Sequence, residues 1–317
     1  MRSRKIIAFV VLCLFGLAIA SLALLQNLPE SPPRYGYIDF TGKVVIPMIY
    51  RNATYFQEGL AEVSLNGKEY GYIDKTGKVV IPFKFYRTYG FSEGLAYFSE
   101  TDDADSLWGF IDRTGRVVIP PQFEKVNRFR AGLAAVVSKK DNPLGLWGFI
   151  DRTGKMVLPP KYFNDFDDIH FSEGLAAVET MDSVGKKKGY IDRTGKVVIP
   201  LQYVFAQEFV NGFAKVDEPV PGKSIQEETT EYCINKLGVK VSVKFCSRKN
   251  IKIHDPEGKL PFNVVYKQHI QVTGQLKYIK DETTGLYGYR DDNRNLIIPY
   301  QFKDAGPFSE GLAYVSK

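Results

Sequence analysis

Apolar and polar positions recur in one fixed order seven times between residues 35 and 317. Each unit starts with an aromatic-Gly-aromatic-Ile-Asp stretch such as YGYID, passes through a polar turn that contains Gly, and continues as VVIP. Strand-forming residues on both sides of such a turn predict a β-hairpin. A GLAxV stretch, which we interpret as a third short strand, completes the unit. The units return every 35 to 56 residues, a period typical of repeat architectures.

The first residue of the turn is an aspartate in five units, and Asn235 and Asp291 take its place in two degenerate copies. The five aspartates are Asp39, Asp74, Asp112, Asp151 and Asp192. An Asp at this position accepts hydrogen bonds from backbone amides of the turn, and the following Gly takes the left-handed conformation. We expect the Pro of VVIP to end the strand, because it has no amide proton to donate.

Two further aromatic positions follow each Pro. The first lies three residues after it, at Tyr50, Phe85, Phe123, Tyr162, Tyr203 and Phe302. The second opens the FSEGLA-like text, at Phe56, Phe91, Phe129, Phe171, Phe209 and Phe308. One hairpin plus one strand cannot bury these rings alone, so we expect neighbouring units to stack and share a core. Aromatic side chains also line the sites of glucan- and choline-binding repeats, but here we interpret them as core.

These motifs, in register over most of the chain, resemble the WG-repeat family, also called KWG repeats. Its units read roughly GLAxV, a loop, and WGYIDxxGKxVIPxxY. The Trp of that pattern is Trp108 and Trp147 here, and Tyr35, Tyr70 and Tyr287 elsewhere. The resemblance implies an all-β domain of seven tandem repeats of short antiparallel strands. It implies no activity, because the family has no shared catalytic residues to transfer.

The two ends of the repeat array are out of phase. The first unit begins with its hairpin at Tyr35, and the sequence finishes on a GLA strand in FSEGLAYVSK. Seven hairpins and seven GLA strands therefore match only if the last strand lies beside the first hairpin, as in a seven-bladed propeller. We favour such a closed ring over an open β-solenoid, which stays open as the alternative.

Residues 1–25 form a leader. RSRK precedes an uncharged run over residues 6–25, about the length of helix that spans a membrane. Positive charge before the run predicts that the N-terminus stays cytoplasmic and that the remainder is exported. The leader is either a signal peptide, cleaved at the small-x-small stretch Ala18 to Ala20, or an uncleaved anchor that holds the protein in the membrane. Both interpretations stay open.

The rest of the chain divides into a proline-rich spacer over residues 26–34 and the repeat domain over residues 35–317. The sixth unit is degenerate and carries an insertion at about residues 244–272. The loops between each GLA strand and the next hairpin vary in length and would emerge on one side of the array. Together with the Lys-rich insertion, these loops are where we expect binding, although no individual binding residue is predicted.

Two motifs imitate catalytic sites. DKTG at Asp74 is the tetrapeptide around the phosphorylated aspartate of cation-pumping ATPases, but the same aspartate recurs in every regular turn. GFSEG at residues 90–94 matches the GxSxG nucleophile elbow, which requires a helix after the serine. FSEG returns at Ser172 and Ser309 without the first glycine. We therefore interpret Asp74 and Ser92 as turn residues.

Metal-binding and cofactor-binding patterns are not predicted either. The histidines, His170, His254 and His269, do not have the spacing of a zinc site. The acidic run over residues 100–105 is interpreted as a solvated loop. Cys233 and Cys246 lie in the degenerate sixth unit, and a disulfide or two buried thiols are equally open. Across the hairpin, Cys233 should face about Val241.

The sequence predicts a non-enzymatic, exported interaction module of the bacterial cell envelope, with another envelope protein as its partner. A carbohydrate- or cell-wall-binding protein is the first alternative, and an envelope hydrolase is the second. A nucleic-acid partner is not expected. The formal net charge is only +6, and Arg2, Arg4 and Lys5 of the leader contribute three of those charges.

Overall fold

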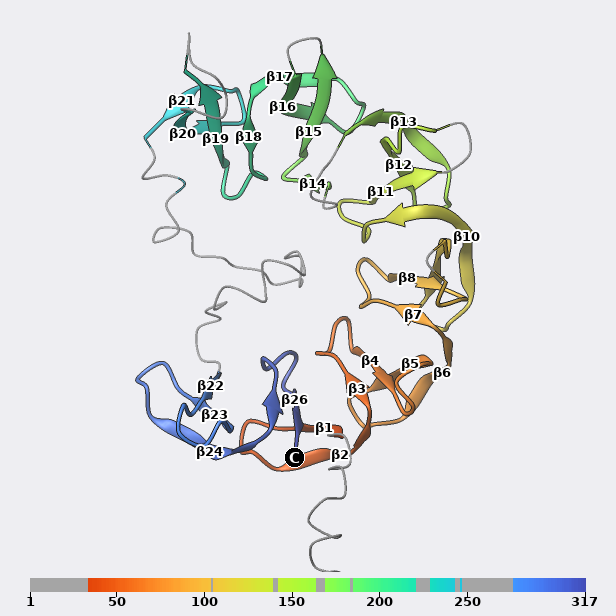
Figure 1. Ribbon diagram of the computed structural model, residues 1–317, viewed down its shortest axis with the longest axis vertical. Coiled ribbons are helices and arrows are strands. Elements are labelled where there is room, and N and C mark those ends of the chain that lie inside the picture. The colour runs from red at the N-terminus through yellow and green to blue at the C-terminus, as the bar shows by residue number, and fades with distance from the viewer. Residues whose placement is uncertain are drawn as a thin grey trace, which may run out of the picture. The chain divides into compact units, whose positions relative to one another are not determined.

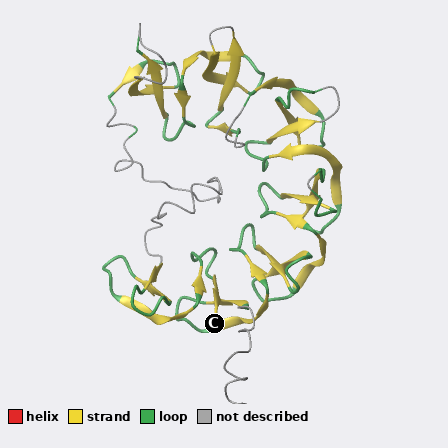
Figure 2. Cartoon of the chain, in the orientation of Figure 1, coloured by secondary structure: helices red, strands yellow, loops and turns green. Residues whose placement is uncertain are grey.

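The structure is a computed structural model, which describes residues 34–103, 105–138, 142–163, 169–182, 185–220, 229–242, 246 and 276–317 (Figure 1). These residues belong to one compact unit, Arg34–Lys317, and their regular elements are strands (Figure 2). The all-β prediction is confirmed for this part of the chain. The expected leader helix at residues 6–25 and nearly all of the insertion at 244–272 lie outside the described residues. Within the described ranges, no helix has the length and apolarity needed to cross a membrane.

The strands in chain order are β1 (Tyr35–Ile38), β2 (Val44–Tyr50), β3 (Asn52–Ala53), β4 (Leu60–Ser64), β5 (Tyr70–Asp74), β6 (Val79–Phe85), β7 (Arg87–Thr88), β8 (Leu95–Ser99), β9 (Trp108–Asp112), β10 (Val117–Val126), β11 (Leu133–Ser138), β12 (Trp147–Asp151), β13 (Met156–Tyr162), β14 (Phe171–Ser172), β15 (Leu175–Asp182), β16 (Gly185–Asp192), β17 (Val197–Tyr203), β18 (Phe205–Ala206), β19 (Phe213–Pro219), β20 (Thr229–Asn235), β21 (Lys240–Val241), β22 (Lys277–Lys280), β23 (Tyr287–Arg290), β24 (Leu296–Phe302), β25 (Asp304–Ala305) and β26 (Ala313–Ser316).

The strands form modules with a common order, which we name A to G. In module A the order across the sheet is β3-β4-β5-β6, that is, a short strand, the GLA strand and the two hairpin strands. The others are module B (β7 to β10), module C (the end of β10 to β13), module D (β14 to β17), module E (β18 to β21), module F (β22 to β24) and module G (β25-β26-β1-β2). The long strand β10 joins modules B and C into one sheet.

The fourth strand of a module was not predicted. In module A it is β3, where Asn52 pairs with Ser64 and Ala53 pairs with Val63 of the GLA strand. The amide of Arg51 also donates to the Ser64 carbonyl at 2.7 Å. Two residues are too few to show an alternating pattern in the sequence. This strand is defined only by its pairing with the edge of β4.

The prediction that the strand ends at the Pro of VVIP is wrong. β6 runs through Pro82 to Phe85, and proline is tolerated because β6 lies at the edge of its sheet. The pairing of β5 with β6 shifts register beside Gly71, and the backbone of β6 comes close to this glycine there. A Cβ on Gly71 would lie 2.5 Å from the Ile81 carbonyl oxygen. This close approach explains why the central glycine of YGYID recurs.

The core is shared between neighbouring modules, as predicted. The second aromatic of each YGYID-like stretch packs on the Phe of the following FSEGLA-like stretch, so Tyr72 of module A contacts Phe91 of module B with ring centroids 4.9 Å apart. Tyr72 is fully buried and its hydroxyl donates to the Tyr89 carbonyl at 2.7 Å. Equivalent ring pairs are Tyr37–Phe56, Phe110–Phe129, Phe149–Phe171, Tyr190–Phe209 and Tyr289–Phe308.

The two ends of the repeat domain meet in module G. β1 pairs with β26 in antiparallel register from Tyr35↔Ser316 to Ile38↔Ala313, and Figure 1 shows the blue C-terminal strand beside the red-orange first hairpin. The predicted match between the last GLA strand and the first hairpin is therefore confirmed.

Module G contacts module A in the way that consecutive modules contact each other. The Glu310 carboxylate accepts from the Gly59 amide at 3.1 Å, as Glu58 accepts from Gly94 at 2.9 Å. Lys75 forms an ion pair with Glu310 at 2.9 Å. The chain continues from module E to module F through residues outside the described ranges.

Candidate functional site

The aspartate of the DKTG motif is used by its own turn. One oxygen of Asp74 accepts from the Thr76 amide at 2.9 Å, the Thr76 hydroxyl at 2.6 Å and the Lys78 amide at 3.1 Å. Gly77 has the expected positive φ of 85°. The Thr76 hydroxyl is the largest cause that lowers the pKa of Asp74. The turn chemistry predicted for this aspartate is confirmed.

The serine of the GxSxG match joins two modules. The Ser92 hydroxyl is buried and donates to the Phe129 carbonyl of the next module at 2.8 Å. Ser172 donates in the same way to Phe209 at 2.7 Å, and Ser309 to Phe56 at 2.6 Å. A tight turn to the GLA strand follows Ser92, with hydrogen bonds in both directions between Ser92 and Leu95. The predicted turn role of Ser92 is confirmed.

Neither the histidines nor the acidic run form a metal cluster among the described residues. His170 contacts the Glu208 carboxylate at 2.7 Å, while His254 and His269 lie outside the described ranges. In the acidic run, the Asp102 side chain is mostly exposed and pairs with Arg87 at 3.0 Å.

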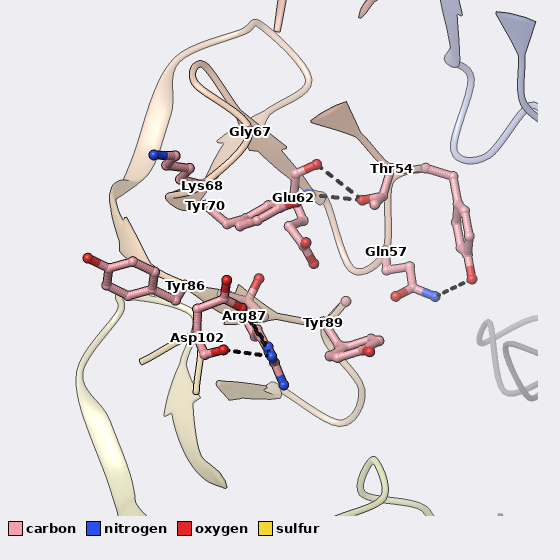
Figure 3. A pocket seen from close by; sticks show the side chains of 13 residues that line it. Thr54, Gln57, Glu62, Gly67, Lys68, Tyr70, Tyr86, Arg87, Tyr89 and Asp102 are labelled. Carbon is pink, nitrogen blue, oxygen red and sulfur yellow. Dashed lines mark hydrogen bonds and ion pairs between the residues drawn. The ribbon is translucent and has the colours of Figure 1, made fainter. Parts of the chain in front are cut away.

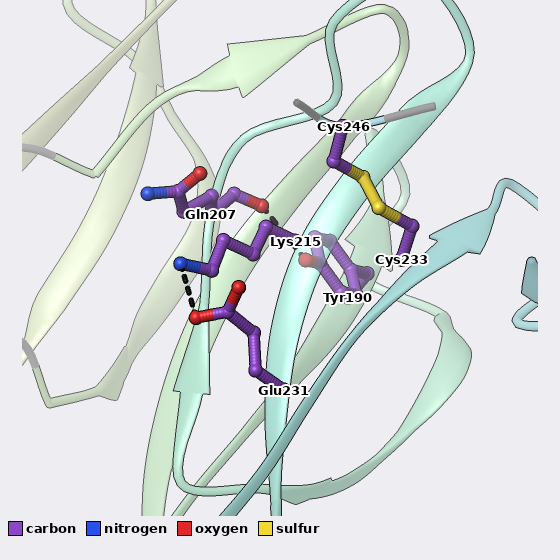
Figure 4. The surroundings of a disulfide bond; sticks show 6 residues. All are labelled: Tyr190, Gln207, Lys215, Glu231, Cys233 and Cys246. Carbon is purple, nitrogen blue, oxygen red and sulfur yellow. Dashed lines mark hydrogen bonds and ion pairs between the residues drawn. A yellow bond between two sulfur atoms is a disulfide. The ribbon is translucent and has the colours of Figure 1, made fainter. Parts of the chain in front are cut away.

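Cys233 and Cys246 form a disulfide in module E, with Cα atoms 5.9 Å apart (Figure 4). Cys233 lies in β20 opposite Val241, as predicted, and is fully buried. On the other side it pairs with Lys215, which forms an ion pair with Glu231. The sequence left open whether these cysteines form a disulfide or stay as free thiols, and the structure shows the disulfide.

A pocket of about 380 Å³ lies where module A meets module B (Figure 3). Four tyrosines line it together with polar and charged side chains. The full lining is Thr54, Tyr55, Gln57, Glu62, Gly67, Lys68, Tyr70, Tyr86, Arg87, Thr88, Tyr89, Gly90 and Asp102. This volume is within the range of small-ligand sites in proteins.

The central group of the pocket is the Glu62 carboxyl. The residue lies in β4 and is only 8% exposed, while Thr54 binds its backbone through hydrogen bonds of 3.0 to 3.2 Å. Burial raises the pKa of Glu62 to about 8, and the nearby Thr88 hydroxyl opposes the shift in part. A carboxyl with this pKa is mostly protonated at neutral pH.

The tyrosines around Glu62 respond to its charge. The pKa of Tyr70 and the pKa of Tyr89 are raised, first by burial and then by the Glu62 carboxylate. Tyr72, which faces Glu62 across the β4–β5 pair, shows the same order of causes for its raised pKa. These three rings therefore lie within electrostatic range of the carboxyl.

Two of the charged residues that line the pocket, Arg87 and Asp102, are paired with each other. Arg87 donates from Nε to the Asp102 carboxylate and from a terminal nitrogen to the Asp102 carbonyl, each at 3.0 Å. Figure 3 shows this pair on the side of the pocket opposite Thr54. Gly90 leaves room for the Gln57 side chain, whose amide donates to the Tyr55 hydroxyl at 3.1 Å. The first glycine of the apparent GxSxG motif thus has a packing role.

The sequence prediction missed Glu62. Its position is the variable residue of GLAxV, which is Tyr97, Ala135, Ala177, Lys215 and Tyr314 in the other regular units. An acidic residue between two apolar strand residues was the available signal. The predicted loops did contribute to the site, because Lys68 and Asp102 come from two of them.

Comparisons with known proteins agree with the repeat pattern. The family model described as "WG containing repeat" matches residues 35–68, 70–102, 108–141, 147–182, 189–218 and 287–317. No curated protein matches the chain.

Solved structures with some likeness include a putative TolB from Agrobacterium tumefaciens (12% identity, TM-score 0.33, 67% of this chain and 89% of that one). Others are BamB from Moraxella catarrhalis (11%, 0.36, 87% and 73%) and apo AztD from Citrobacter koseri (12%, 0.37, 90% and 99%).

Proposed function

Because the chain belongs to the family of WG-containing repeat proteins, we propose that its domain is a non-enzymatic binding module of the bacterial cell envelope. Its partner is another envelope protein, and its contact site is the pocket between modules A and B. Family membership supports a repeat scaffold. The assignment of a binding role rests on the pocket.

One observation carries this proposal: Glu62 is a buried acid at a position where the same fold is built with alanine. Ala135 and Ala177 occupy the equivalent places in modules C and D, and Ala135 is 1% exposed. Burying a carboxyl without an ion-pair partner costs stability, so the packing of the module does not account for Glu62. Strongly shifted acids in pockets are frequent at functional sites.

The hydrogen bonds of the other candidate groups support binding rather than hydrolysis. Asp74 and Ser92, the two residues that resemble catalytic groups, direct their side chains into structural hydrogen bonds. The second carboxylate of the pocket, Asp102, is held by Arg87. A glycosidase would use two carboxyl groups on either side of the scissile bond, whereas here the second carboxylate has an ion-pair partner.

Export is supported by two features. The basic residues before the apolar run favour translocation of everything after it. The Cys233–Cys246 disulfide fits an oxidising compartment. Whether the leader stays in the membrane or is cleaved does not alter the proposed site.

We also propose that modules A to G close into a ring. The G-to-A contacts of Ser309 and Glu310 support this, because they repeat the contacts between consecutive modules. Deleting residues 308–317 tests it by hydrogen exchange. Because β26 pairs with β1, lost protection of the first hairpin, Tyr37 to Val45, is expected from that pairing alone. A closed ring predicts in addition lost protection in module E, which would contact module F. Unchanged protection at either place would contradict the ring.

Site-specific photocrosslinking tests the binding role. A photoreactive phenylalanine replaces Tyr86 at the pocket rim, and the same replacement of Tyr278 in module F is the control, because both side chains are 40% exposed. In native envelopes we expect one protein to crosslink at position 86 and not at position 278. Equal products at both positions, or none at either, would contradict a protein contact at the pocket.

A glycan is the second candidate partner, and the half-buried rings of Tyr55, Tyr70 and Tyr89 favour it. Aromatic walls with a few polar groups are typical of small-ligand sites. Binding to a glycan array that is lost in Tyr89→Ala, together with no crosslinked protein, would replace the protein partner by a glycan.

A further inference from the structure

Glu62 has no counter-ion among the described residues. None of the causes of its shifted pKa is a cation. Two cations line the same pocket: Arg87 is engaged by Asp102, and Figure 3 shows the Lys68 side chain directed away from the Glu62 carboxyl. The side chain is nevertheless directed into the pocket, where Figure 3 shows its carboxyl between Tyr70 and Tyr89. A buried carboxylate is stabilised by a cation at short range, and the pocket offers the space for one.

The walls of the pocket suit a cation as well. Tyrosine rings attract ammonium and guanidinium groups that lie within about 6 Å of the ring centre. Figure 3 shows the Tyr70 and Tyr89 rings on either side of the Glu62 carboxyl, and Tyr55 and Tyr86 also line this pocket of about 380 Å³. Tyr89 is held in place by stacking on Tyr97, with ring centroids 4.4 Å apart. The site therefore combines one acid with aromatic walls, a combination found where proteins recognise alkylammonium groups.

We propose that this pocket binds the alkylammonium group of a ligand, with the Glu62 carboxylate as its counter-ion and the tyrosine rings as its walls. The inference rests on the proposed function in one respect, that the pocket is the contact site. A lysine side chain of a partner protein, a polyamine and a choline headgroup share this chemistry.

Binding is coupled to one proton. Glu62 has a pKa of about 8, so below pH 8 the ammonium ligand displaces the carboxyl proton when it binds. Affinity then rises about tenfold from pH 6 to pH 7 and several-fold more from pH 7 to pH 8. The other titratable or charged groups that face Glu62 or line the pocket are Tyr37, Tyr55, Tyr70, Tyr72, Tyr86, Tyr89, Arg87, Asp102 and Lys68. Tyr37, Tyr70, Tyr72 and Tyr89 stay neutral over this interval because their pKa values are raised.

A neutral ligand predicts the opposite trend. If the protonated Glu62 donated a hydrogen bond to a sugar or amide, affinity would fall as pH rises through 8. The sign of the pH dependence therefore separates a cationic ligand from a neutral one.

Isothermal titration of the full-length protein tests the proposal. The probe is Nα-acetyl-lysine methylamide, and the neutral control is its 6-hydroxynorleucine counterpart. We expect binding of the ammonium probe only, with affinity rising from pH 6 to pH 8, and at least a tenfold loss in Glu62→Gln. The control variant Glu69→Gln changes an acid outside the pocket lining and should bind normally. Unfolding curves of both variants serve to check that each variant is folded.

The remaining outcomes are decisive in either direction. Spermidine or phosphocholine binding with the same pH dependence supports the ammonium site and assigns a polyamine or a lipid headgroup as its source. Equal affinity for the neutral probe, falling affinity with rising pH, or full affinity in Glu62→Gln overturns the proposal. Because photocrosslinking at Tyr86 does not depend on charge, a protein partner found there with no ammonium binding would refute this inference and leave the proposed function standing.

Discussion

Glu62→Gln should make the protein more stable, by an amount that depends on pH. The variant keeps the shape of the side chain and removes its titration. In the unfolded chain the carboxyl ionises near its ordinary pKa of 4.5, whereas in the folded protein it ionises at about 8. Between these values the unfolded state has released a proton that the folded state retains, so the stability of the wild-type protein falls as pH rises.

The size of the effect follows from the two pKa values. Each pH unit inside the interval costs the wild type about 1.4 kcal/mol. At pH 7, two and a half units above 4.5, the accumulated cost is about 3 kcal/mol. The group is 8% exposed, so solvent screening reduces this value little. A loss of this size is a large fraction of the about 5 to 15 kcal/mol that stabilises a typical domain.

Urea unfolding followed by circular dichroism at pH 5, 6, 7 and 8 measures the difference. The gap between Glu62→Gln and the wild type should widen steadily up to pH 8 and stay constant above it. Glu69→Gln, in the loop after the same strand, reports the effect of losing one acid from outside the pocket. A gap that is the same at pH 5 and pH 8 would show that the Glu62 carboxyl is not buried in the pocket.

Three other changes test the repeat scaffold. Gly71→Ala should cost about 3 kcal/mol in urea unfolding, because its Cβ would lie 2.5 Å from the Ile81 carbonyl oxygen; Gly145→Ala, with nothing within 4 Å, should cost only about 1 to 2 kcal/mol for its positive φ. Cys233→Ser should lower stability by about 3 kcal/mol, and reductant should then lower the melting temperature of the wild type but not of the variant; an equal effect on both would argue against the disulfide. Asp112→Asn should cost about 1 kcal/mol near neutral pH. The Thr114 hydroxyl is the largest cause that lowers the pKa of Asp112 to about 2. The stability that Asp112 contributes is therefore present above pH 4 and is lost as pH falls towards 2. The difference in unfolding free energy between variant and wild type should shrink over that interval.

Much of the scaffold was predictable because each module repeats the same local chemistry. Asp74 and Gly77 specify a turn through their own side chain and backbone, so neighbouring modules are not needed to predict it. The pairing of β1 with β26 followed from counting hairpins and GLA strands. The passage of β6 through Pro82 was not predictable in the same way, because proline is tolerated only at a sheet edge and the sequence does not state which strand is the edge.

The pocket could not be predicted from the repeat pattern, for a related reason. The repeat pattern consists of what the units share, whereas Glu62 differs from Ala135 and Tyr97 at the same position. Whether an acid in a strand is buried depends on the module that packs against it, in this case through Thr88 and Tyr89 of module B. That information lies in the contact between units rather than in one unit.

In a repeat protein the equivalent modules provide an internal control that single-copy folds lack. Module C shows that the fold accepts alanine at the position of Glu62, so the cost of about 3 kcal/mol at neutral pH is separable from the requirements of folding. Local choices that conflict with stability tend to occur at functional sites. The conflict here is confined to one side chain, in one pocket, where tyrosine rings and space for a ligand are also present. An ammonium ligand would convert the destabilising carboxyl into half of a buried ion pair. Glu62→Gln should therefore weaken ammonium binding and raise the free energy of unfolding together.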